Sequence, residues 1–460
     1  MKLSIDKVVT AVNGEIISES SAPIIIHGVS IDSREEQTGK LFVALKGERV
    51  DGHDFVAAVF ASGAAAILVE QDIDLDALSV PHGAVIRVQS THQALKDLAA
   101  YYIRTLSVKV VGITGSAGKT TTKDMVYAVL SQKYRTLKTE GNFNNEIGLP
   151  LTVFRLEPFH EYAVMEMGMN HAGEIDRLSK IAPPDIAIIT NIGLAHIENL
   201  GSRDGIFAAK SEMLGNLKPD GIAVLNGNDD KLQTLQGKLP HPICYFGTTP
   251  ICEVRATEIV SNGLEATEST VKIGDAPSFK LKVNLPGKHI AMNALAAVAV
   301  GHIAGVSVED MKHGIEGFEM TKMRLDIFKQ GDITIINDVY NASPDSMKGA
   351  LDILAGAEQG CRKVCILGDM FELGDYSQQL HEEVAQYACD KGIDVIVLAG
   401  ERFRHGYNAV KEHCAVRYYV DQQACLKYID EILKPGDVVL VKASRGMGFE
   451  QTIKHLRGEA

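Results

Sequence analysis

The sequence predicts an α/β protein divided into three domains with parallel sheets at their centres. The chain has 460 residues, of which 45% are apolar. A single hydrophobic core stops growing at roughly 250–300 residues, so more than one domain is expected. Short runs rich in β-branched residues alternate with Ala-rich amphipathic segments along the whole chain. This alternation is typical of strands and helices that wind around a parallel sheet.

Changes in this pattern divide the chain into three blocks. The first, residues 1–106, ends in a segment with helical spacing, THQALKDLAAYYIRTL. The second, residues 107–318, has expected strands in VKVVGIT, YAVMEMG, DIAIITN and GIAVLN, followed by a β-rich stretch and an expected helix in KHIAMNALAAVAVGHIAG. The third, residues 319–460, has expected strands in ITIIND, KVCILGD, DVIVLAG, VRYYV and DVVLVKAS. We expect each block to form one domain.

Composition and charge argue against several classes of protein. The formal net charge of −13 repels polyanions and argues against nucleic acid as a partner. The first residues, MKLSIDKVV, carry charges where a signal peptide needs an apolar core, and no apolar run is long enough to span a bilayer. We therefore expect a cytoplasmic protein without membrane insertion, and we also expect a monomer. The seven cysteines are scattered mostly through the last half, which indicates reduced thiols rather than a disulfide framework.

The segment GITGSAGKTTTKDM, residues 112–125, lies between an expected strand and an expected helix. A P-loop needs glycines so that backbone N–H groups can wrap phosphates, a lysine for the outer phosphates and a hydroxyl for Mg²⁺. The common pattern has glycine five residues before Gly118, where this chain has Ile113. A glycine-rich turn without a ligand is the alternative, but the flanking strand and helix favour a nucleotide site. The expected nucleotide-binding loop comprises Gly115, Ser116, Ala117, Gly118, Lys119, Thr120 and Thr121.

Two further polar residues follow expected strands of the second block. YAVMEMG reaches Glu166 at the carboxyl end of a strand, the edge where parallel sheets bind ligands, and a carboxylate there could bind Mg²⁺. A solvated acid at the strand end is the alternative. AIITNIGLAH leads from a strand to Asn191 and His196. Imidazole is an unusual ligand for Mg²⁺, and a lone loop histidine is usually polar surface, so the pattern alone leaves His196 open.

Lys210 lies on an apolar stripe. In GIFAAKSEML its neighbours three and four positions away are Ile206, Phe207, Met213 and Leu214. The side chain could cover the core with its stem while its ammonium reaches water. Alternatively, burial could lower its pKa, so that the neutral amine adds carbon dioxide and becomes a carbamate, an anionic oxygen ligand for Mg²⁺.

Three long segments carry a resemblance to the Mur ligase family. GITGSAGKTTTKDM, GNFNNEIGLPLT and TNIGLAHIENLGSRDGIFAAKSEML occur in the family's order, and the resemblance covers essentially the whole chain. It implies an ATP-dependent amide ligase with a central P-loop ATPase-like domain and a Rossmann-like C-terminal domain. It implies Lys119 and Thr120 at the phosphates, Glu166 and His196 at two magnesium ions, and Lys210 as a carbamate at the metal beside His196. The implied catalytic residues are Lys119, His196 and Lys210.

The resemblance also implies the remaining parts of the ATP site. It offers Asn293, in KHIAMNA, to the adenine. The third block, which closes over the nucleotide in this family, supplies Arg324, Asp338, Tyr340 and Asn341. Two local differences stand out, because Ser343 occupies a position where asparagine is usual and Ala443 one where glycine is usual.

The first block resembles the UDP-sugar-binding domain of two family members, which add the third residue and the final dipeptide to the cell-wall precursor. It does so in SIDSREEQTGKLFVALKGERVDGHDF. NDVYNASPDSM resembles the dipeptide-adding member, and the Asp-Asn-Pro-Arg segment of the other is absent. The implied reaction joins D-alanyl-D-alanine, bound by the third domain, to UDP-N-acetylmuramoyl-tripeptide through an acyl phosphate. The expected substrate-binding residues are Ser33, Arg34, Lys46, Asp51, Gly52, His53, Asn142, Asn144 and Asn145.

Alternatives remain at this point. Without the resemblance, the Arg34 segment would fit a surface loop with a salt bridge. A regulatory P-loop switch would hydrolyse nucleotide without a second substrate, and a small-molecule kinase would release a phosphorylated product and no amide. Folylpolyglutamate-type ligases lack the DSR and DGHDF segments of the first block. Lysine and diaminopimelate both remain open as the third residue of the acceptor peptide.

Overall fold

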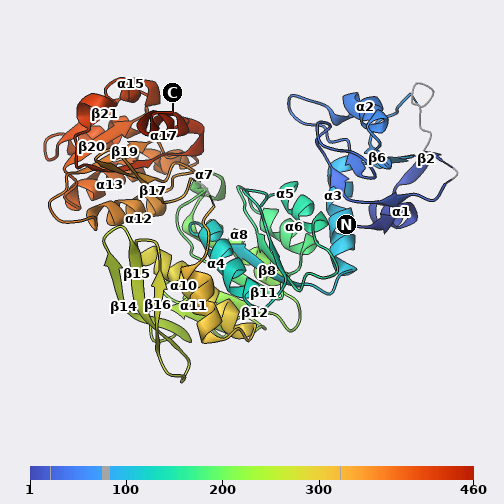
Figure 1. Ribbon diagram of the computed structural model, residues 1–460, viewed down its shortest axis with the longest axis horizontal. Coiled ribbons are helices and arrows are strands. Elements are labelled where there is room, and N and C mark those ends of the chain that lie inside the picture. Colours follow the sequence, from blue (N-terminus) through green and yellow to red (C-terminus); the bar gives the residue numbers. More distant parts are fainter. Residues whose placement is uncertain (21, 75–82, 322, 460) are drawn as a thin grey trace.

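The computed structural model describes residues 1–20, 22–74, 83–321 and 323–459. They form three α/β units, and the first and last lie on opposite sides of the central one (Figure 1). The main sheets of the units have five, nine and six strands in chain order, and parallel pairing predominates in each. The predicted α/β class with parallel sheets is therefore confirmed. The domain boundaries after residues 106 and 318 remain a prediction.

The first unit is a small sheet with a long helix that joins it to the rest of the chain. Helix α3 (Thr91–Arg104) packs against α1 (Ile5–Val12) of this unit and against α5 (Gly148–Phe154) and α6 (Glu174–Ile181) of the central unit. The strands run in the order β2-β7-β6-β5-β4, with β1 and β3 as a separate pair. The other elements are β1 (Leu3–Ser4), β2 (Glu15–Glu19), β3 (Ile25–Ile26), β4 (Val29–Ser30), β5 (Leu41–Val43), η1 (Gly52–Phe55), α2 (Val56–Ala61), β6 (Ala66–Val69) and β7 (Ala84–Arg87).

The central unit brings the ends of three buried parallel strands to one edge of its sheet. Strand β8 (Lys109–Thr114) lies between β10 (Tyr162–Glu166) and β11 (Ile186–Ile189). Glu166 pairs in register with Ile113, and Ile189 with Thr114, so the segments after these strands begin side by side. Such an edge is where parallel sheets bind ligands.

The other strands of this unit extend the sheet, and its end is antiparallel. The elements are α4 (Lys119–Ser131), β9 (Thr136–Lys138), α7 (Ile197–Leu200), α8 (Arg203–Gly215), β12 (Ile222–Asn226), α9 (Asp230–Gln233), β13 (Ile243–Gly247), β14 (Val254–Asn262), β15 (Ala266–Ile273), β16 (Phe279–Val283), α10 (Lys288–Ile303) and α11 (Val308–Glu316). The sheet order is β16-β15-β14-β13-β12-β11-β8-β10-β9, with β14, β15 and β16 antiparallel to one another. The Ala-rich α10 is buried on most sides and packs against α4. Within the described ranges, no helix combines the length and apolar character needed to cross a membrane.

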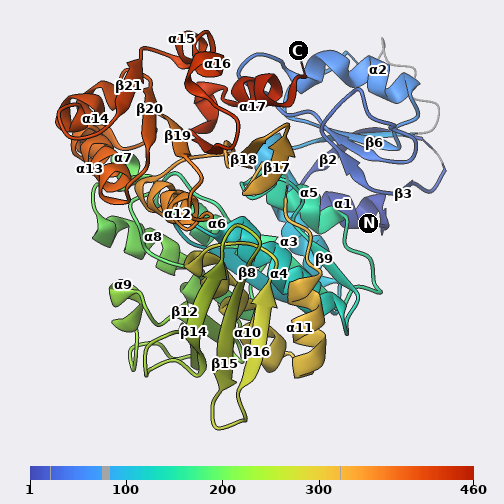
Figure 2. The ribbon, with the colours of Figure 1, turned by 60° about the vertical axis from the view of Figure 1, so that its left-hand side comes forward.

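The C-terminal unit is a six-stranded sheet with helices on both faces. Its elements are β17 (Asp326–Gln330), β18 (Ile333–Asn337), α12 (Pro344–Ala355), β19 (Lys363–Gly368), η2 (Gly374–Tyr376), α13 (Ser377–Asp390), β20 (Val395–Ala399), α14 (Phe403–Val410), β21 (Val416–Tyr419), α15 (Gln422–Leu426), α16 (Ile429–Ile432), β22 (Val438–Lys442), η3 (Arg445–Met447) and α17 (Glu450–Arg457). The order is β17-β18-β22-β19-β20-β21, parallel except for β17 at the edge. Figures 1 and 2 show α12 on the side that faces the central unit.

The expectation that all cysteines are reduced is wrong for one pair. Cys389 and Cys414 form a disulfide, with their Cα atoms 6.0 Å apart. Cys389 lies in the last turn of α13 and Cys414 follows α14, and these two helices pack against each other. Tertiary packing thus brings together two cysteines whose spacing in the sequence gives no signal. The other five cysteines are free.

Candidate functional site

A cavity of about 480 Å³ lies between the central and C-terminal units. The central unit lines it with the P-loop, Asn191 and His196, and the C-terminal unit with residues that follow β18, β19 and β22. The predicted residues on its wall are Ser116, Ala117, Gly118, Lys119, Thr120, Thr121, His196, Asn293, Arg324, Asp338, Tyr340 and Asn341. Residues that the sequence did not single out also line it, among them Glu372, Lys442 and Arg445. Their only sequence signal is that each follows or ends an apolar strand.

The P-loop has a backbone that only glycine fits at two positions. Gly115 and Gly118 have φ angles of 151° and 79°. A Cβ on Gly115 would lie 1.8 Å from Thr190 Oγ1, and one on Gly118 would lie 2.6 Å from Asn293 Oδ1. Because α4 begins at the next residue, Lys119, the loop presents the positive end of a helix to the cavity. The absence of glycine at Ile113 therefore does not disturb the turn.

Lys119 folds back over this loop, where its Nζ donates a hydrogen bond of 2.8 Å to Gly115 O. Burial lowers the pKa of the Lys119 ammonium below its ordinary value, and the charge of Glu166 partly offsets this shift. A phosphate group in the cavity would favour the charged form in the same way as Glu166 does.

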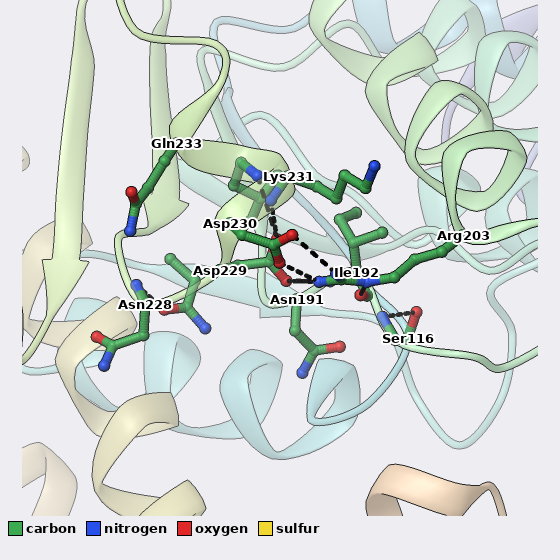
Figure 3. Close-up of polar contacts among 12 residues, drawn as sticks. Ser116, Asn191, Ile192, Arg203, Asn228, Asp229, Asp230, Lys231 and Gln233 are labelled. Atoms are coloured by element: carbon green, nitrogen blue, oxygen red, sulfur yellow. Dashed lines mark hydrogen bonds and ion pairs between the residues drawn. The ribbon is translucent and has the colours of Figure 1, made fainter.

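Hydrogen bonds to the backbone N–H and C=O of one residue, Ile192, hold the loop after β11 in place beside the P-loop (Figure 3). Ile192 N donates to Asp229 Oδ2 at 2.7 Å, and Ile192 O accepts from Arg203 Nε at 2.7 Å. Arg203 also pairs with Asp230, with Nη2 and Oδ1 2.5 Å apart. One residue further, Gly193 N donates to Ser116 Oγ of the P-loop at 2.9 Å. The loop that carries His196 is thus fixed within the central unit.

Glu166 offers a buried oxygen for a cation. Its side chain is 2% exposed, and its Oε1 accepts a hydrogen bond of 2.9 Å from Asn144 Nδ2. Its Oε2 has no hydrogen-bond partner in the described part of the chain, and Lys123 Nζ lies 3.8 Å away. A buried carboxylate oxygen without a donor needs an explanation, and a divalent cation is one.

His196 contacts the C-terminal unit. It has a left-handed backbone, with a φ of 64°, and its Nδ1 lies 2.5 Å from Glu372 Oε2. This contact lowers the pKa of the Glu372 carboxyl. Metal-binding imidazoles commonly have a carboxylate on the second nitrogen, so the arrangement leaves Nε2 for a ligand.

Lys210 lies in α8 and is 1% exposed. Burial holds the pKa of its amine well below the ordinary value, and the charge of Lys119 contributes in the same direction. No hydrogen bond or ion pair joins its Nζ to another described residue. These conditions suit a neutral amine better than a solvated ammonium.

The site has hard oxygen donors, but no cluster of acidic and histidine side chains. Among the described residues, no three His, Cys, Asp or Glu side chains lie close enough to bind one metal ion. Mg²⁺ prefers oxygen ligands, and the site offers Glu166 Oε2 and the Thr120 hydroxyl. Thr120 is 2% exposed. These residues fit Mg²⁺ bound jointly by protein and phosphate oxygens.

An aromatic ring and several cations form the wall on the C-terminal side. The guanidinium of Arg324 lies 4.2 Å from the ring centroid of Tyr340, and that of Arg445 lies 5.1 Å from it. Lys442 forms an ion pair with Asp338 and donates a hydrogen bond of 2.9 Å to Asn341 O. The Nε of Arg324 has no hydrogen-bond partner among the described residues.

The expected UDP-binding residues lie in the first unit, away from this cavity. Arg34 has an 88% exposed side chain, and its guanidinium forms a fork on Asp32, with Nη2 and Oδ2 2.6 Å apart. This contact lowers the pKa of Asp32 to about 2. Ser33 is half-buried and Lys46 is exposed, with a backbone bridge between Lys46 and Asp51. Arg34 and Lys46 are therefore accessible to an anion.

Asp51, Gly52 and His53 form a compact turn. Asp51 Oδ1 accepts hydrogen bonds from His53 N at 3.0 Å and from its ring at 2.6 Å, which lowers the pKa of Asp51 to about 2. The His53 side chain is only 5% exposed, and its Nε2 accepts from Glu70 N. A Cβ on Gly52 would lie 2.8 Å from Leu45 N. The turn uses these side chains internally, and the N–H groups of Gly52 and His53 also donate within it, to Leu45 O and Asp51 Oδ1.

The three predicted asparagines of the GNFNNE segment differ in surroundings. Asn144 holds Glu166, as described above. Asn145 Oδ1 accepts from Gly148 N at 2.8 Å and thereby stabilises the start of α5. Asn142 is exposed. Of these three asparagines, Asn144 is therefore the one that donates a hydrogen bond to Glu166.

Three family models match the chain in the order of its units. The model described as "Mur ligase family, catalytic domain" matches residues 25–103, "Mur ligase middle domain" matches 113–301, and "Mur ligase, glutamate ligase domain" matches 323–445. The UDP-N-acetylmuramoyl-tripeptide--D-alanyl-D-alanine ligase of Bacillus subtilis is 40% identical over 99% of this chain and 98% of its own length. The chain belongs to the Mur ligase family. The Escherichia coli ligase of the same name is 34% identical over 99% of both chains.

Solved structures of Mur ligases have the same fold. A crystal structure of MurF from Acinetobacter baumannii has a TM-score of 0.91 and 34% identity, over 100% of this chain and 99% of its own. MurF from Thermotoga maritima in complex with ADP has a TM-score of 0.82 and 29% identity, over 94% and 97% of the two chains. The resemblance predicted from the sequence is confirmed. In this Mur ligase, the cavity lies between the parts that match the middle and glutamate ligase models.

Proposed function

We propose that this Mur ligase joins D-alanyl-D-alanine to UDP-N-acetylmuramoyl-tripeptide with the cleavage of ATP, giving UDP-N-acetylmuramoyl-pentapeptide, ADP and phosphate. The observation that carries the proposal is the interdomain cavity, in which a glycine-built P-loop faces Arg324 and Tyr340. Full-length similarity to enzymes with this activity in their names supports it. We propose that the protein acts as a cytoplasmic monomer on these small-molecule substrates.

The reaction needs activation because a carboxylate is a poor electrophile. Transfer of the ATP γ-phosphoryl group to the tripeptide carboxylate gives an acyl phosphate and ADP. The amine of D-alanyl-D-alanine then attacks the acyl carbon, loses a proton, and expels phosphate to leave the amide. Lys119 and the loop N–H groups neutralise charge on the phosphates, and positioning dominates such a transfer.

Magnesium fits the donors on this chain and would supply charge neutralisation at the phosphates. Thr120 and Glu166 would hold one ion, and His196 with a Lys210 carbamate the other. Burial and the lowered pKa of Lys210 support carbamate formation, because only the neutral amine adds carbon dioxide. The carbamate would give the metal beside His196 the hard oxygen that imidazole lacks.

We propose that the remaining predicted residues bind the adenine, the dipeptide and the UDP-linked substrate. Asn293 would meet the adenine, and the third domain would close over the nucleotide and bind the dipeptide. Closure is supported by the cavity, whose walls come from two units joined by one chain segment. Arg34 and Lys46, both exposed in the first unit, would bind the UDP diphosphate.

The test is ATP turnover with the lysine-containing and the diaminopimelate-containing acceptors, each with and without D-alanyl-D-alanine. Phosphate release that requires one acceptor and the dipeptide, with an amide product, is expected. Release without either substrate would indicate a regulatory P-loop switch. A stable phosphorylated product without an amide would indicate a small-molecule kinase.

A further inference from the structure

A buried carboxylate joins the P-loop helix to the segment that leads into the C-terminal unit. Asp124 lies in α4, and its side chain is fully buried. Its Oδ2 accepts two hydrogen bonds from one residue, from Thr321 N at 3.0 Å and from Thr321 Oγ1 at 2.8 Å. Thr321 lies between α11, the last helix of the central unit, and β17, the first strand of the C-terminal unit. The contact is therefore made where the chain passes from one unit to the other.

The other oxygen of Asp124 faces two lysines. Lys138 Nζ donates to Oδ1 at 2.7 Å, and Lys123 Nζ lies 3.5 Å from it. The Lys123 side chain is 1% exposed, and its Nζ is also 3.8 Å from Oε2 of Glu166. A buried carboxylate is costly to leave unpaired, so these cations and the two donors of Thr321 hold Asp124 in one position.

The two residues of this contact lie close in sequence to residues on both sides of the cavity. Asp124 follows Lys119 by about one and a half turns of α4, so it keeps a fixed position relative to the P-loop. Arg324, three residues after Thr321, lines the cavity and lies against Tyr340. The position of Thr321 therefore limits where Arg324 can lie relative to the P-loop.

We propose that Asp124 is the anchor of the hinge: it holds Thr321 to the P-loop helix while the C-terminal unit moves beyond this residue. Asp124 and Thr321 are positioning residues that act through Arg324, and Lys123 links their anchor to the carboxylate of Glu166. A carboxylate suits this role because, when ionised, it only accepts hydrogen bonds, and the described hydrogen-bond partners of the Asp124 side chain are all donors. The inference rests on the proposed function, since it assigns how that ligase assembles its ATP site.

The experiment compares Thr321→Val, which removes the hydroxyl donor at nearly constant shape, with Thr321→Ser, which retains it. Thr234→Val is the matched control, because Thr234 directly follows α9 and its Oγ1 donates to Lys231 O of that helix on an exposed surface. Two quantities are measured in the full-length protein. They are the hydrogen-exchange rate of the Thr321 amide without ligands and the steady-state constants for ATP and for the UDP-linked substrate.

In Thr321→Val we expect the backbone amide at position 321 to exchange hydrogen about five- to tenfold faster, because the loss of one hydrogen bond costs about 1 kcal/mol. We expect a rise of similar size in KM for ATP and no change in KM for the UDP-linked substrate. Thr321→Ser should restore both values, and Thr234→Val should match the wild type. Unchanged exchange, equal effects on both KM values, or failure of serine to rescue would each overturn the inference. Absence of ligation by the wild-type protein would instead overturn the proposed function, while the exchange measurement would still test the anchor.

Discussion

His381 is predicted to make stability depend on pH between neutrality and pH 4. The side chain lies in α13 and is fully buried, with its ring packed edge-on against Phe403. Its Nε2 accepts a hydrogen bond of 3.0 Å from Met370 N, and its Nδ1 lies 2.6 Å from Ser377 O. These partners require a neutral ring with its proton on Nδ1, and among the described residues no acceptor lies within hydrogen-bond distance of Nε2 for a second proton.

The surrounding charges and burial act against protonation. Burial lowers the pKa of His381 from 6.5 to about 4, and the charges of Arg402 and His405 contribute in the same direction. Ser377 O opposes this shift as an acceptor, and Asp369 Oδ1 lies 4.0 Å from Nε2. Between pH 6.5 and 4 the unfolded chain binds a proton that the folded protein does not. The stabilisation is therefore complete above pH 6.5 and lost as pH falls toward 4.

The size of the effect follows from the shift. A pKa lowered from 6.5 to about 4 corresponds to about 3 kcal/mol, of which about 2 kcal/mol is lost between pH 7 and pH 4.5. Protonation of Nε2 would also break the hydrogen bond from Met370, two residues before Glu372, which contacts His196. Acid should therefore loosen the loop that reaches the candidate site before it unfolds the protein.

The assay combines urea unfolding at pH 7 and pH 4.5 with NMR titration of the His381 ring. His381→Gln is the comparison, because a glutamine oxygen can accept from Met370 N but does not titrate in this range. The wild type should lose about 2 kcal/mol more than the variant between the two pH values. Equal losses, or a ring that titrates near pH 6.5, would refute the reasoning.

Three further predictions concern the site. Lys210→Met should change the free energy of unfolding by less than about 1 kcal/mol, or raise it, because it removes a buried amine without a partner. The same variant should abolish ligation, and urea unfolding and product analysis check the two effects. Ligation by Lys210→Arg at the wild-type rate would exclude the carbamate. Arg34→Ala should raise KM for the UDP-linked substrate far more than KM for ATP, and equal effects would remove Arg34 from the site. Arg203→Met should lower kcat several-fold while the fold persists, because Ile192 O loses its hydrogen bond from Arg203. Initial rates and thermal unfolding measure the two effects, and an unchanged kcat would mean that other contacts hold the loop.

The parts of the site that depend on local pattern could be predicted from the sequence. The P-loop requires glycine at particular backbone angles, and Gly115 and Gly118 have them. Glu166 could be placed because a carboxylate after an apolar run lies at the end of a strand, and parallel pairing of β8 and β10 brings that end to the P-loop. Helical spacing placed Lys210 on the apolar stripe of α8 but left open whether its amine reaches water, and the structure buries the side chain.

Other features depend on contacts between distant segments, which periodicity does not encode. Lys123 and Asp124 follow the P-loop as two adjacent charges, a pattern that usually indicates a solvated helix face. They are buried because β9, β10 and the segment at Thr321 cover that face of α4. His53 remains a predicted substrate-binding residue as part of the turn from Asp51, and the structure adds that both of its ring nitrogens have partners within the first unit.

The hydrogen bonds between the central and C-terminal units at the rim are exposed, whereas the contact of Asp124 with Thr321 at the hinge involves a buried carboxylate. At the rim, Leu194 N donates to Asp345 Oδ2 at 3.1 Å, and Tyr376 OH donates to Gly201 O at 3.3 Å, both at exposed positions. Each such bond is worth about 0.5–1.5 kcal/mol, and exposed ion pairs add little.

A ligand that binds the rearranged form about 1,000-fold more tightly than the original form supplies about 4 kcal/mol, enough to replace two or three rim contacts. The buried contact of Asp124 with Thr321 costs more to break, because it would leave Oδ2 of a buried carboxylate without its two donors. Ligands can therefore exchange the rim contacts while the hinge persists. Movement of the C-terminal unit should then begin after Thr321 and carry Arg324 and Glu372 together, so the nucleotide side and the His196 side of the cavity change in one step.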